Sequence, residues 1–139
     1  MNNIELISEA INASEYTYSP YSKFRVGAAL LTSDDTVYKG CNIENASFSA
    51  TVCAERTAFF KAVSDGKKSF KRIAIVGMNG SDISEYTAPC GVCRQIMREF
   101  CDDDFEIVLV KSESEYKILK LAELLPHSFT NVNLGENYG

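Results

Sequence analysis

The hydrophobic and polar positions of the first half of the chain alternate between helical and extended periods. Apolar residues recur every three to four positions near the start, and this predicts a helix that ends in the polar, aromatic segment 14–20: Ile4, Leu6, Ile7, Ala10, Ile11 and Ala13. The apolar run 24–31 predicts a strand, and turn residues at 33–35 make residues 36–38 the returning strand of a hairpin. A polar loop at 42–49 then precedes a strong helix at 52–63, which Asp65 and Gly66 close.

The second half continues the alternation of strands and helices. Residues 73–76 predict a short buried strand, and a turn at 79–82 opens a loop that reaches Pro89. A helix at 92–100, a buried strand at 105–110, a further strand at 116–119 and a short helix at 121–125 follow. Helices alternating with buried strands indicate a layered α/β sandwich, a single domain over residues 1–139. Ligands in such folds gather where strands give way to helices, here near Cys53 and Cys90.

Composition and charge narrow the class of function. The chain has 139 residues, is 45% hydrophobic and has a formal net charge of −5, with 14 Lys and Arg against 19 Asp and Glu. Because no dense Lys/Arg cluster appears, binding that depends on neutralising many phosphates is disfavoured, and we expect no nucleic-acid partner. No apolar segment is long enough to span a bilayer, and we expect no membrane partner. Five cysteines and no export signal predict a cytoplasmic protein, where clustered thiols bind metal more often than they form disulfides.

Two short motifs supply three thiols and one carboxylate. Cys53-Ala54-Glu55 lies where a polar loop becomes a helix, and Pro89-Cys90-Gly91-Val92-Cys93 lies at a second such point. A Cys-x-x-Cys pair at the start of a helix lets both sulfurs reach one ion, and a third sulfur leaves tetrahedral Zn²⁺ with one open position, as in catalytic sites. The positive ends of the two helix dipoles also favour thiolates. Cys41 and Cys101 fit no spacing for the same ion.

The residues that follow Cys53 complete the candidate chemistry. Three thiolates around Zn²⁺ sum to a charge of −1, which weakens acidification of a bound water, and Arg56 could offset this by donating hydrogen bonds to the sulfurs. Glu55, held just off the metal, could take a proton from the water and return it to a leaving amine, as in nucleobase deaminases. Taken separately, the cysteines also fit a closed structural zinc site, buried thiols or a redox dithiol. Glu55 alone also fits a solvated helix face, and Arg56 a surface ion pair.

Nearly the whole chain resembles the small, zinc-dependent cytidine deaminases of the homotetrameric type with a three-cysteine zinc shell. The resemblance is carried by residues 18–24 (YSPYSKF), 26–30 (VGAAL), 40–46 (GCNIENA), 53–58 (CAERTA), 89–95 (PCGVCRQ) and 124–126 (LLP). It implies a three-layer α/β/α sandwich around a mixed, about five-stranded sheet. It also implies one Zn²⁺ per chain on Cys53, Cys90 and Cys93, with Glu55 as proton shuttle while hydroxide attacks C4 of the base and ammonia leaves.

The resemblance also implies a substrate and its contacts. Free cytidine and deoxycytidine are the expected substrates, in pyrimidine salvage, within a cytoplasmic homotetramer whose sites lie at subunit interfaces. Asn42 and Glu44 match residues that bond the ribose 3′-hydroxyl, Phe24 an aromatic packed against the base, and Ala54 a backbone contact to the pyrimidine. Phe129 matches an aromatic that reaches a neighbouring subunit's site. Taken alone, Phe24 also fits a core residue, and Asn42 and Glu44 a solvated loop.

Three positions depart from the family pattern. Phe48 replaces a common Tyr, the loop 78–87 is long, and His127, the only histidine, has no partner at ligand spacing and is predicted to be an exposed loop residue.

Three other functions compete with nucleoside deamination: deamination of a cytosine-bearing antibiotic nucleoside, editing of nucleic acid, and a non-catalytic zinc-stabilised interaction module. The absence of Trp and the charge of −5 disfavour the editor, and a sealed metal with a dispensable Glu55 would indicate the module.

Overall fold

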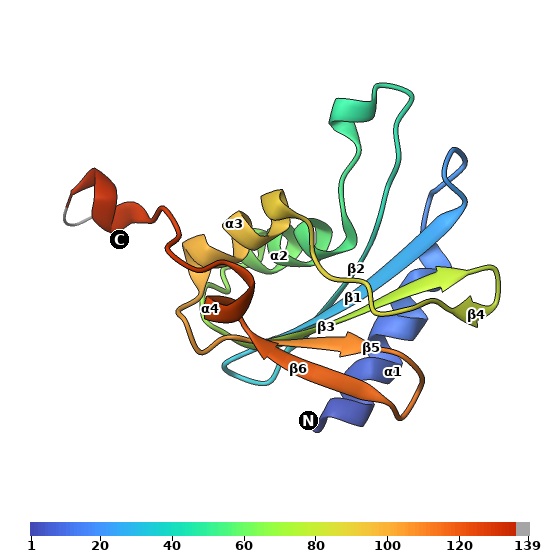
Figure 1. Ribbon diagram of the computed structural model, residues 1–139, viewed down its shortest axis with the longest axis horizontal. Helices are drawn as coiled ribbons and strands as arrows, with labels where there is room; N and C mark the ends of the chain where they lie inside the picture. The colour runs from blue at the N-terminus through green and yellow to red at the C-terminus, as the bar shows by residue number, and fades with distance from the viewer. Residues whose placement is uncertain (136–139) are drawn as a thin grey trace.

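A computed structural model describes residues 1–135 and places helices on both faces of a central sheet (Figure 1). The helices are α1 (Asn3–Ala13), α2 (Ala54–Ser64), α3 (Gly91–Phe100) and α4 (Leu121–Leu124), and the 3-10 turns are η1 (Ser14–Tyr16), η2 (Phe48–Ala50) and η3 (Asn131–Leu134). The strands are β1 (Phe24–Thr32), β2 (Val37–Cys41), β3 (Phe70–Asn79), β4 (Asp82–Ile83), β5 (Glu106–Val110) and β6 (Tyr116–Lys120). A capping box starts α1, in which the Asn2 side chain accepts the Glu5 N–H and the Glu5 carboxylate accepts the Asn2 N–H.

The sheet is mixed, as expected. Its strand order is β2-β1-β3-β5-β6, with β4 paired to the end of β3. Only β3 and β5 run parallel, and the chain between them crosses one face as α3. The remaining neighbours are antiparallel. The short β4 adds one strand to the expected number, because Asp82 and Ile83 fold back onto Asn79 and Met78.

Two hydrophobic clusters lie on opposite faces of this sheet because successive strand side chains point to opposite sides. On one face α1 packs against alternate residues of the strands, with a core of Leu6, Ile7, Ala10, Ala29, Leu31, Ala74, Val76, Met78, Val108 and Val110. On the other face α2 and α3 cover Leu30, Ile73 and Ile107, and the buried Phe59 contacts three further phenylalanine rings. The three-layer α/β/α sandwich predicted from the sequence is therefore confirmed.

The elements differ from the sequence prediction mainly at their ends. The hydrophobic run predicted a strand only at 73–76, but β3 extends over Phe70–Asn79 because it pairs along the whole of β1. In the same way β2 reaches Cys41, whose partner is Gly27. The long loop after β3 is anchored to β6, where Lys117 Nζ lies 4.5 Å from the Tyr86 ring centroid. Pairing and anchoring of this kind depend on distant residues, so a local pattern does not predict them.

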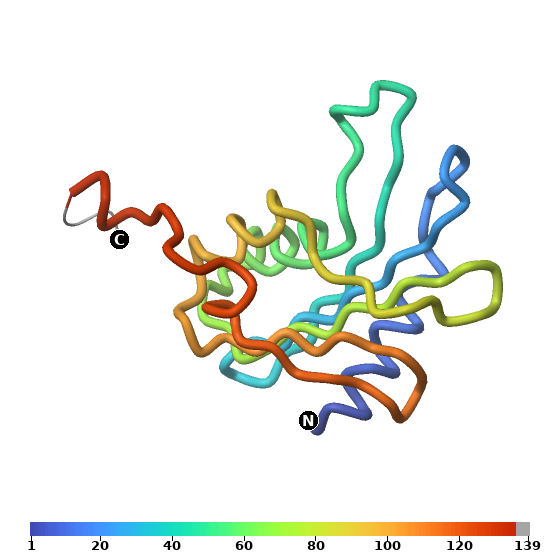
Figure 2. Tube along the Cα trace, viewed as in Figure 1, coloured from blue at the N-terminus to red at the C-terminus, as the bar shows by residue number. Residues whose placement is uncertain are grey.

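Two loops project from the end of the sheet at which β1 begins (Figure 2). Segment 17–23 leads into β1, and segment 42–53 connects β2 to α2. Isolated bridges join Tyr18 to Ile43 and Ile43 to Val52, so the two loops are tied together at their base. Residues 1–135 include no helix with both the length and the apolar character needed to cross a membrane.

Candidate functional site

Three cysteine sulfurs meet where α2 and α3 begin. Cys53 is the N-cap residue of α2, Cys90 is the N-cap residue of α3, and Cys93 lies in the first turn of α3. The Sγ atom of Cys53 lies 3.8 Å from Sγ of Cys90, which lies 3.5 Å from Sγ of Cys93. Neither N-cap side chain accepts a capping hydrogen bond from a backbone N–H of its own helix, so both sulfurs are available as ligands. The structure thus brings together all three residues predicted to hold a metal.

The geometry and chemistry of this cluster fit Zn²⁺ with an open position. A tetrahedral ion with Zn–S bonds of about 2.3 Å needs sulfurs about 3.8 Å apart, and the observed spacings are close to this value. Thiolate donors favour zinc over hard cations. Within residues 1–135, no further His, Cys, Asp or Glu atom joins the group in which all ligand atoms lie within 4.8 Å of one another. His127 is exposed in the loop after α4, as expected.

Arg56 contacts the metal cluster from the first turn of α2. Its Nη2 lies 3.4 Å from Sγ of Cys53, to which it donates a hydrogen bond. Hydrogen bonds from Cys93 and Arg56 lower the pKa of the Cys53 thiol to about 5, against the opposing effect of burial. The pKa of the Cys93 thiol is raised, because Cys93 donates a hydrogen bond to Cys53 and because it is buried. The guanidinium therefore lies where it can compensate negative charge on the sulfurs.

Glu55 is a buried carboxylate beside the cluster. Only 4% of the residue is exposed, and its oxygens do not belong to the group of metal-ligand atoms. Burial raises the pKa of Glu55 to about 7, and the nearby Cys53 contributes in the same direction. A carboxyl group that changes protonation near neutral pH is suited to both accepting and donating a proton. A solvated helix-face carboxylate, the alternative left open by the sequence, is excluded by this burial.

Asn42 and Phe24 are joined through the backbone of β1. The amide of Asn42 accepts the N–H of Val26 at 2.9 Å through Oδ1 and donates from Nδ2 to the carbonyl of Phe24 at 3.0 Å. These two bonds fix the orientation of the amide and leave one Nδ2 hydrogen and one Oδ1 lone pair unused. Phe24 is half-buried, and a Cβ placed on Gly77 would lie 2.5 Å from Cζ of its ring. The ring therefore lies against β3.

Glu44 joins the two projecting loops. Its Oε1 accepts the N–H of Tyr21 at 2.9 Å and of Ser22 at 3.1 Å, and its Oε2 accepts the Ser22 hydroxyl. The Ser22 hydroxyl and these backbone donors hold the pKa of the Glu44 carboxyl below its usual value. Phe48, at the tip of the second loop, is 77% exposed and lies edge-on to the Tyr21 ring at 6.2 Å between centroids.

Two further predicted contact residues have very different surroundings. Ala54 is fully buried at the start of α2, and its carbonyl faces Gly40 of β2 so closely that a Cβ on Gly40 would lie 2.3 Å from it. Phe129 is 58% exposed on the segment that extends away from the body after α4 (Figure 1). Gln95 of α3 holds this segment by donating to the Phe129 carbonyl at 2.9 Å. Phe129 thus presents its side chain outward, where a neighbouring molecule can contact it.

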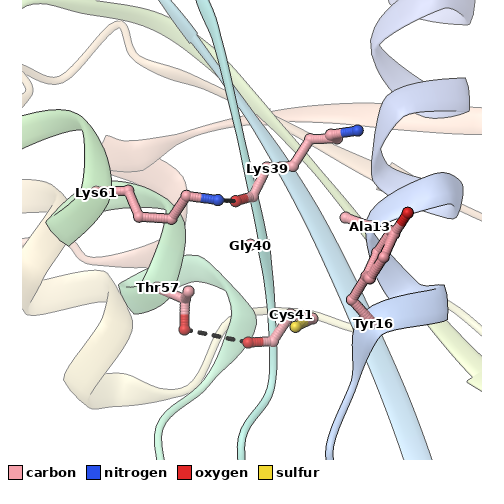
Figure 3. A pocket seen from close by; sticks show the side chains of 7 residues that line it. All are labelled: Ala13, Tyr16, Lys39, Gly40, Cys41, Thr57 and Lys61. Carbon is pink, nitrogen blue, oxygen red and sulfur yellow. Dashed lines mark hydrogen bonds between the residues drawn. The ribbon is translucent and has the colours of Figure 1, made fainter. Parts of the chain in front are cut away.

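A separate groove runs beside the free edge of β2 (Figure 3). It has a volume of about 280 Å³ and is lined by Ala13, Tyr16, Lys39, Gly40, Cys41, Thr57 and Lys61. Side chains of α2 satisfy two carbonyls of this edge, because Lys61 donates to Lys39 and Thr57 donates to Cys41 at 3.1 Å. Cys41 therefore belongs to the edge of the sheet and not to the metal cluster. Cys101 lies at the C-cap of α3, where burial raises its pKa.

The sequence interpretation missed the residues that surround the Phe24 ring. A Cβ on Gly77 would also lie 2.2 Å from Oγ1 of Thr87 and 2.9 Å from Oγ of Ser84, so the loop after β3 packs beside the ring. A glycine inside a predicted strand is the signal that could have indicated this close approach.

Fold and site together indicate a class of protein: a metal-dependent enzyme in which three cysteine sulfurs at two helix N-termini could hold the ion and leave one coordination position open beside a buried carboxylate. Comparison with known proteins gives the family. Residues 1–109 match the model of the cytidine and deoxycytidylate deaminase zinc-binding region. The chain belongs to this family of zinc-binding hydrolases, and within residues 1–135 its three-cysteine cluster is the group that could hold the Zn²⁺.

Individual relatives agree over nearly the full length. The chain is 49% identical over 130 residues to a cytidine deaminase of Sporosarcina psychrophila, with 94% of this chain and 93% of that protein covered. It is 45% identical over 136 residues to a cytidine deaminase of Halalkalibacterium halodurans, with 98% and 100% covered. The crystal structure of a cytidine deaminase from Burkholderia pseudomallei superimposes with a TM-score of 0.85 at 43% identity, covering 93% of this chain and 100% of that one.

Proposed function

We propose that this protein hydrolytically deaminates free cytidine and deoxycytidine to uridine and deoxyuridine, with release of ammonia, in pyrimidine salvage. The observation that carries the proposal is the buried Glu55 carboxylate beside three sulfur ligands that leave one metal position open. A sealed structural zinc site would have a fourth protein donor, and none joins the cluster within residues 1–135. A non-catalytic module is therefore disfavoured.

The residues of the chain divide the chemistry between them. Zinc, when bound, supplies an activated water for addition to C4 of the base. Glu55 takes a proton from the attacking water and delivers it to N3. It then takes the remaining proton of the hydroxyl added at C4 and passes it to the amine, so that the C4 carbonyl forms as the C–N bond breaks and ammonia leaves. Arg56 compensates the charge of the sulfurs. The Phe24 ring packs against the base, and the backbone of Ala54 contacts the pyrimidine.

The unused hydrogen-bonding groups of Asn42 and Glu44 suit a sugar hydroxyl. Asn42 retains one N–H donor, while Glu44 retains an acceptor site on its carboxylate. A hydroxyl accepts from the first and donates to the second, so both groups are satisfied. A 3′-phosphate or a continuing strand has no proton to donate there and would face the negative Glu44. This chemistry supports a free nucleoside and disfavours nucleic acid.

We further propose a cytoplasmic homotetramer with sites completed at subunit interfaces. The segment after α4 exposes apolar side chains that a monomer leaves in water, with Phe129 58%, Val132 80% and Leu134 63% exposed. All five cysteines are free, which suits a reducing compartment. Phe129 would reach the site of a neighbouring subunit.

A parallel absorbance assay tests the substrate class. Cytidine, deoxycytidine, cytosine, CMP and a single-stranded oligonucleotide are offered to the same zinc-loaded preparation, and cytidine also competes with an antibiotic cytosine nucleoside. We expect turnover of cytidine and deoxycytidine, with the oligonucleotide unchanged. Preference for the oligonucleotide or for the antibiotic would replace the proposal with one of those activities.

Replacing Glu55 tests the mechanism. Glu55→Gln preserves the size of the side chain but removes the titrating carboxyl, so we expect zinc to remain bound while kcat falls by about 10²- to 10⁴-fold. Zinc content by metal analysis and kcat by absorbance are measured together. Glu99→Gln on the exposed face of α3 is the matched control. A fully active Glu55→Gln enzyme would contradict the role of proton shuttle.

A further inference from the structure

The Glu44 carboxylate has nearly all of its acceptor sites occupied before any substrate binds. A carboxylate offers about four lone-pair sites over its two oxygens. The N–H groups of Tyr21 and Ser22 occupy both sites of Oε1, and the Ser22 hydroxyl occupies one site of Oε2. One site therefore remains, and it lies on the oxygen that the Ser22 hydroxyl already holds.

The Ser22 hydroxyl makes two hydrogen bonds within this network. It donates its only proton to Glu44 Oε2 and accepts the backbone N–H of Phe24 at 3.1 Å. The carbonyl of Phe24 in turn accepts from Asn42, so both polar backbone groups of Phe24 are held by this network. The Ser22 hydroxyl thus connects Glu44, the proposed acceptor of the sugar hydroxyl, with Phe24, the residue proposed to pack against the base.

We propose that Ser22 is a positioning residue for sugar recognition, which orients Glu44 Oε2 so that its remaining lone pair meets the 3′-hydroxyl of the nucleoside. The inference rests on the proposed function, because it takes Glu44 as the acceptor of that hydroxyl. Ser22 does not touch the substrate in this account. Its effect passes through Oε2, while the two backbone donors keep Oε1 in place.

Steady-state kinetics with cytidine and 3′-deoxycytidine test the proposal. Ser22→Ala removes the hydroxyl and leaves both backbone donors, so we expect KM for cytidine to rise about tenfold, as for loss of a hydrogen bond to a charged group, with kcat nearly unchanged. With 3′-deoxycytidine, which lacks the hydroxyl that Oε2 would accept, wild type and Ser22→Ala should have equal KM. Ser22 is exposed, so Ser22→Thr can retain the hydroxyl and should restore the wild-type KM for cytidine.

Controls separate this role from a loss of loop structure. Ser19→Ala removes a hydroxyl from the same loop and should keep wild-type constants. An unchanged KM in Ser22→Ala, an equal rise with both nucleosides, or a Thr variant that behaves like the Ala variant would each overturn the positioning role. A wild-type enzyme that leaves cytidine unchanged would instead refute the proposed function itself, so the two failures are distinguishable.

Discussion

At the scale of single residues, the sequence indicated candidate side chains for the chemistry but not how each one is held. The three cysteines, Glu55 and Arg56 could be selected because their types and spacing suit an open zinc site. The burial of Glu55 and the contact of Arg56 with Cys53 required the structure, since they depend on how α2 packs against the sheet. The links from Ser22 to Glu44 and Phe24 left no signal in composition or periodicity.

Arg56 provides a prediction at this scale. Arg56→Ala leaves the negative charge of the sulfurs uncompensated, so we expect zinc affinity or kcat/KM to fall about 10- to 100-fold, as for other residues that support metal ligands. Zinc retained against a competing chelator is measured beside the kinetics. Lys68→Ala, which removes one exposed positive charge from the loop before β3, is the control. Wild-type zinc retention and activity in Arg56→Ala would count against charge compensation.

At the scale of elements, hydrophobic periodicity was sufficient for the helices and the central strands. The helices α2 and α3 and the strand β5 were predicted to within a few residues, because one buried face imposes its period on each. The ends of β3 and the whole of β4 were not predicted. Their residues include polar ones, which join a sheet only when a partner strand is present. The unpredicted end of β3 includes Gly77, which lies against the Phe24 ring of the candidate site.

Gly77 yields a prediction about the substrate pocket. In Gly77→Ala the new methyl would lie 2.5 Å from the Phe24 ring and 2.2 Å from Thr87 Oγ1, so the ring must move. The tip of the ring can shift, and we expect a modest loss of stability of about 1 kcal/mol. KM for cytidine should rise several-fold because the ring no longer lies where the base packs.

The matched control is Gly66, which has a positive φ but open space where a side chain would be added. Gly66 has φ of 88°, and apart from its chain neighbours no atom lies within 4 Å of where a methyl group would be, so Gly66→Ala should lower stability by about 1 kcal/mol through backbone strain alone. Its KM should equal that of wild type. Thermal unfolding and kinetics on both variants separate the two effects, and a wild-type KM in Gly77→Ala would contradict the packing argument.

At the scale of the whole molecule, the candidate metal site joins segments that are far apart in sequence. Cys53 starts α2 and Cys90 starts α3, with the entire length of β3 between them. The sequence could predict that these positions meet, because the resemblance placed both in one site. It could not predict the groove beside β2 or the anchoring of the segment after α4, which arise from packing between layers.

Removing the metal should therefore destabilise the fold. A ligand at 1,000 times its Kd stabilises the native state by about 4 kcal/mol, so we expect chelation to lower Tm by roughly 10 °C or more and added Zn²⁺ to restore it. Differential scanning calorimetry with and without chelator measures the shift. Cys90→Ser should lose most of the shift and Cys41→Ser should retain it. Equal Tm values with and without metal in the wild type would argue against this structural contribution.

The double use of Glu44 restricts how sugar selectivity can change. The same carboxylate fastens two loops and, on the proposed role, recognises the sugar. A substitution at this position that relaxed the demand for a 3′-hydroxyl would also remove the hydrogen bonds that hold Tyr21 and Ser22 of the first loop to the second. Variants that accept altered sugars should consequently arise from neighbouring positions that leave this fastening intact.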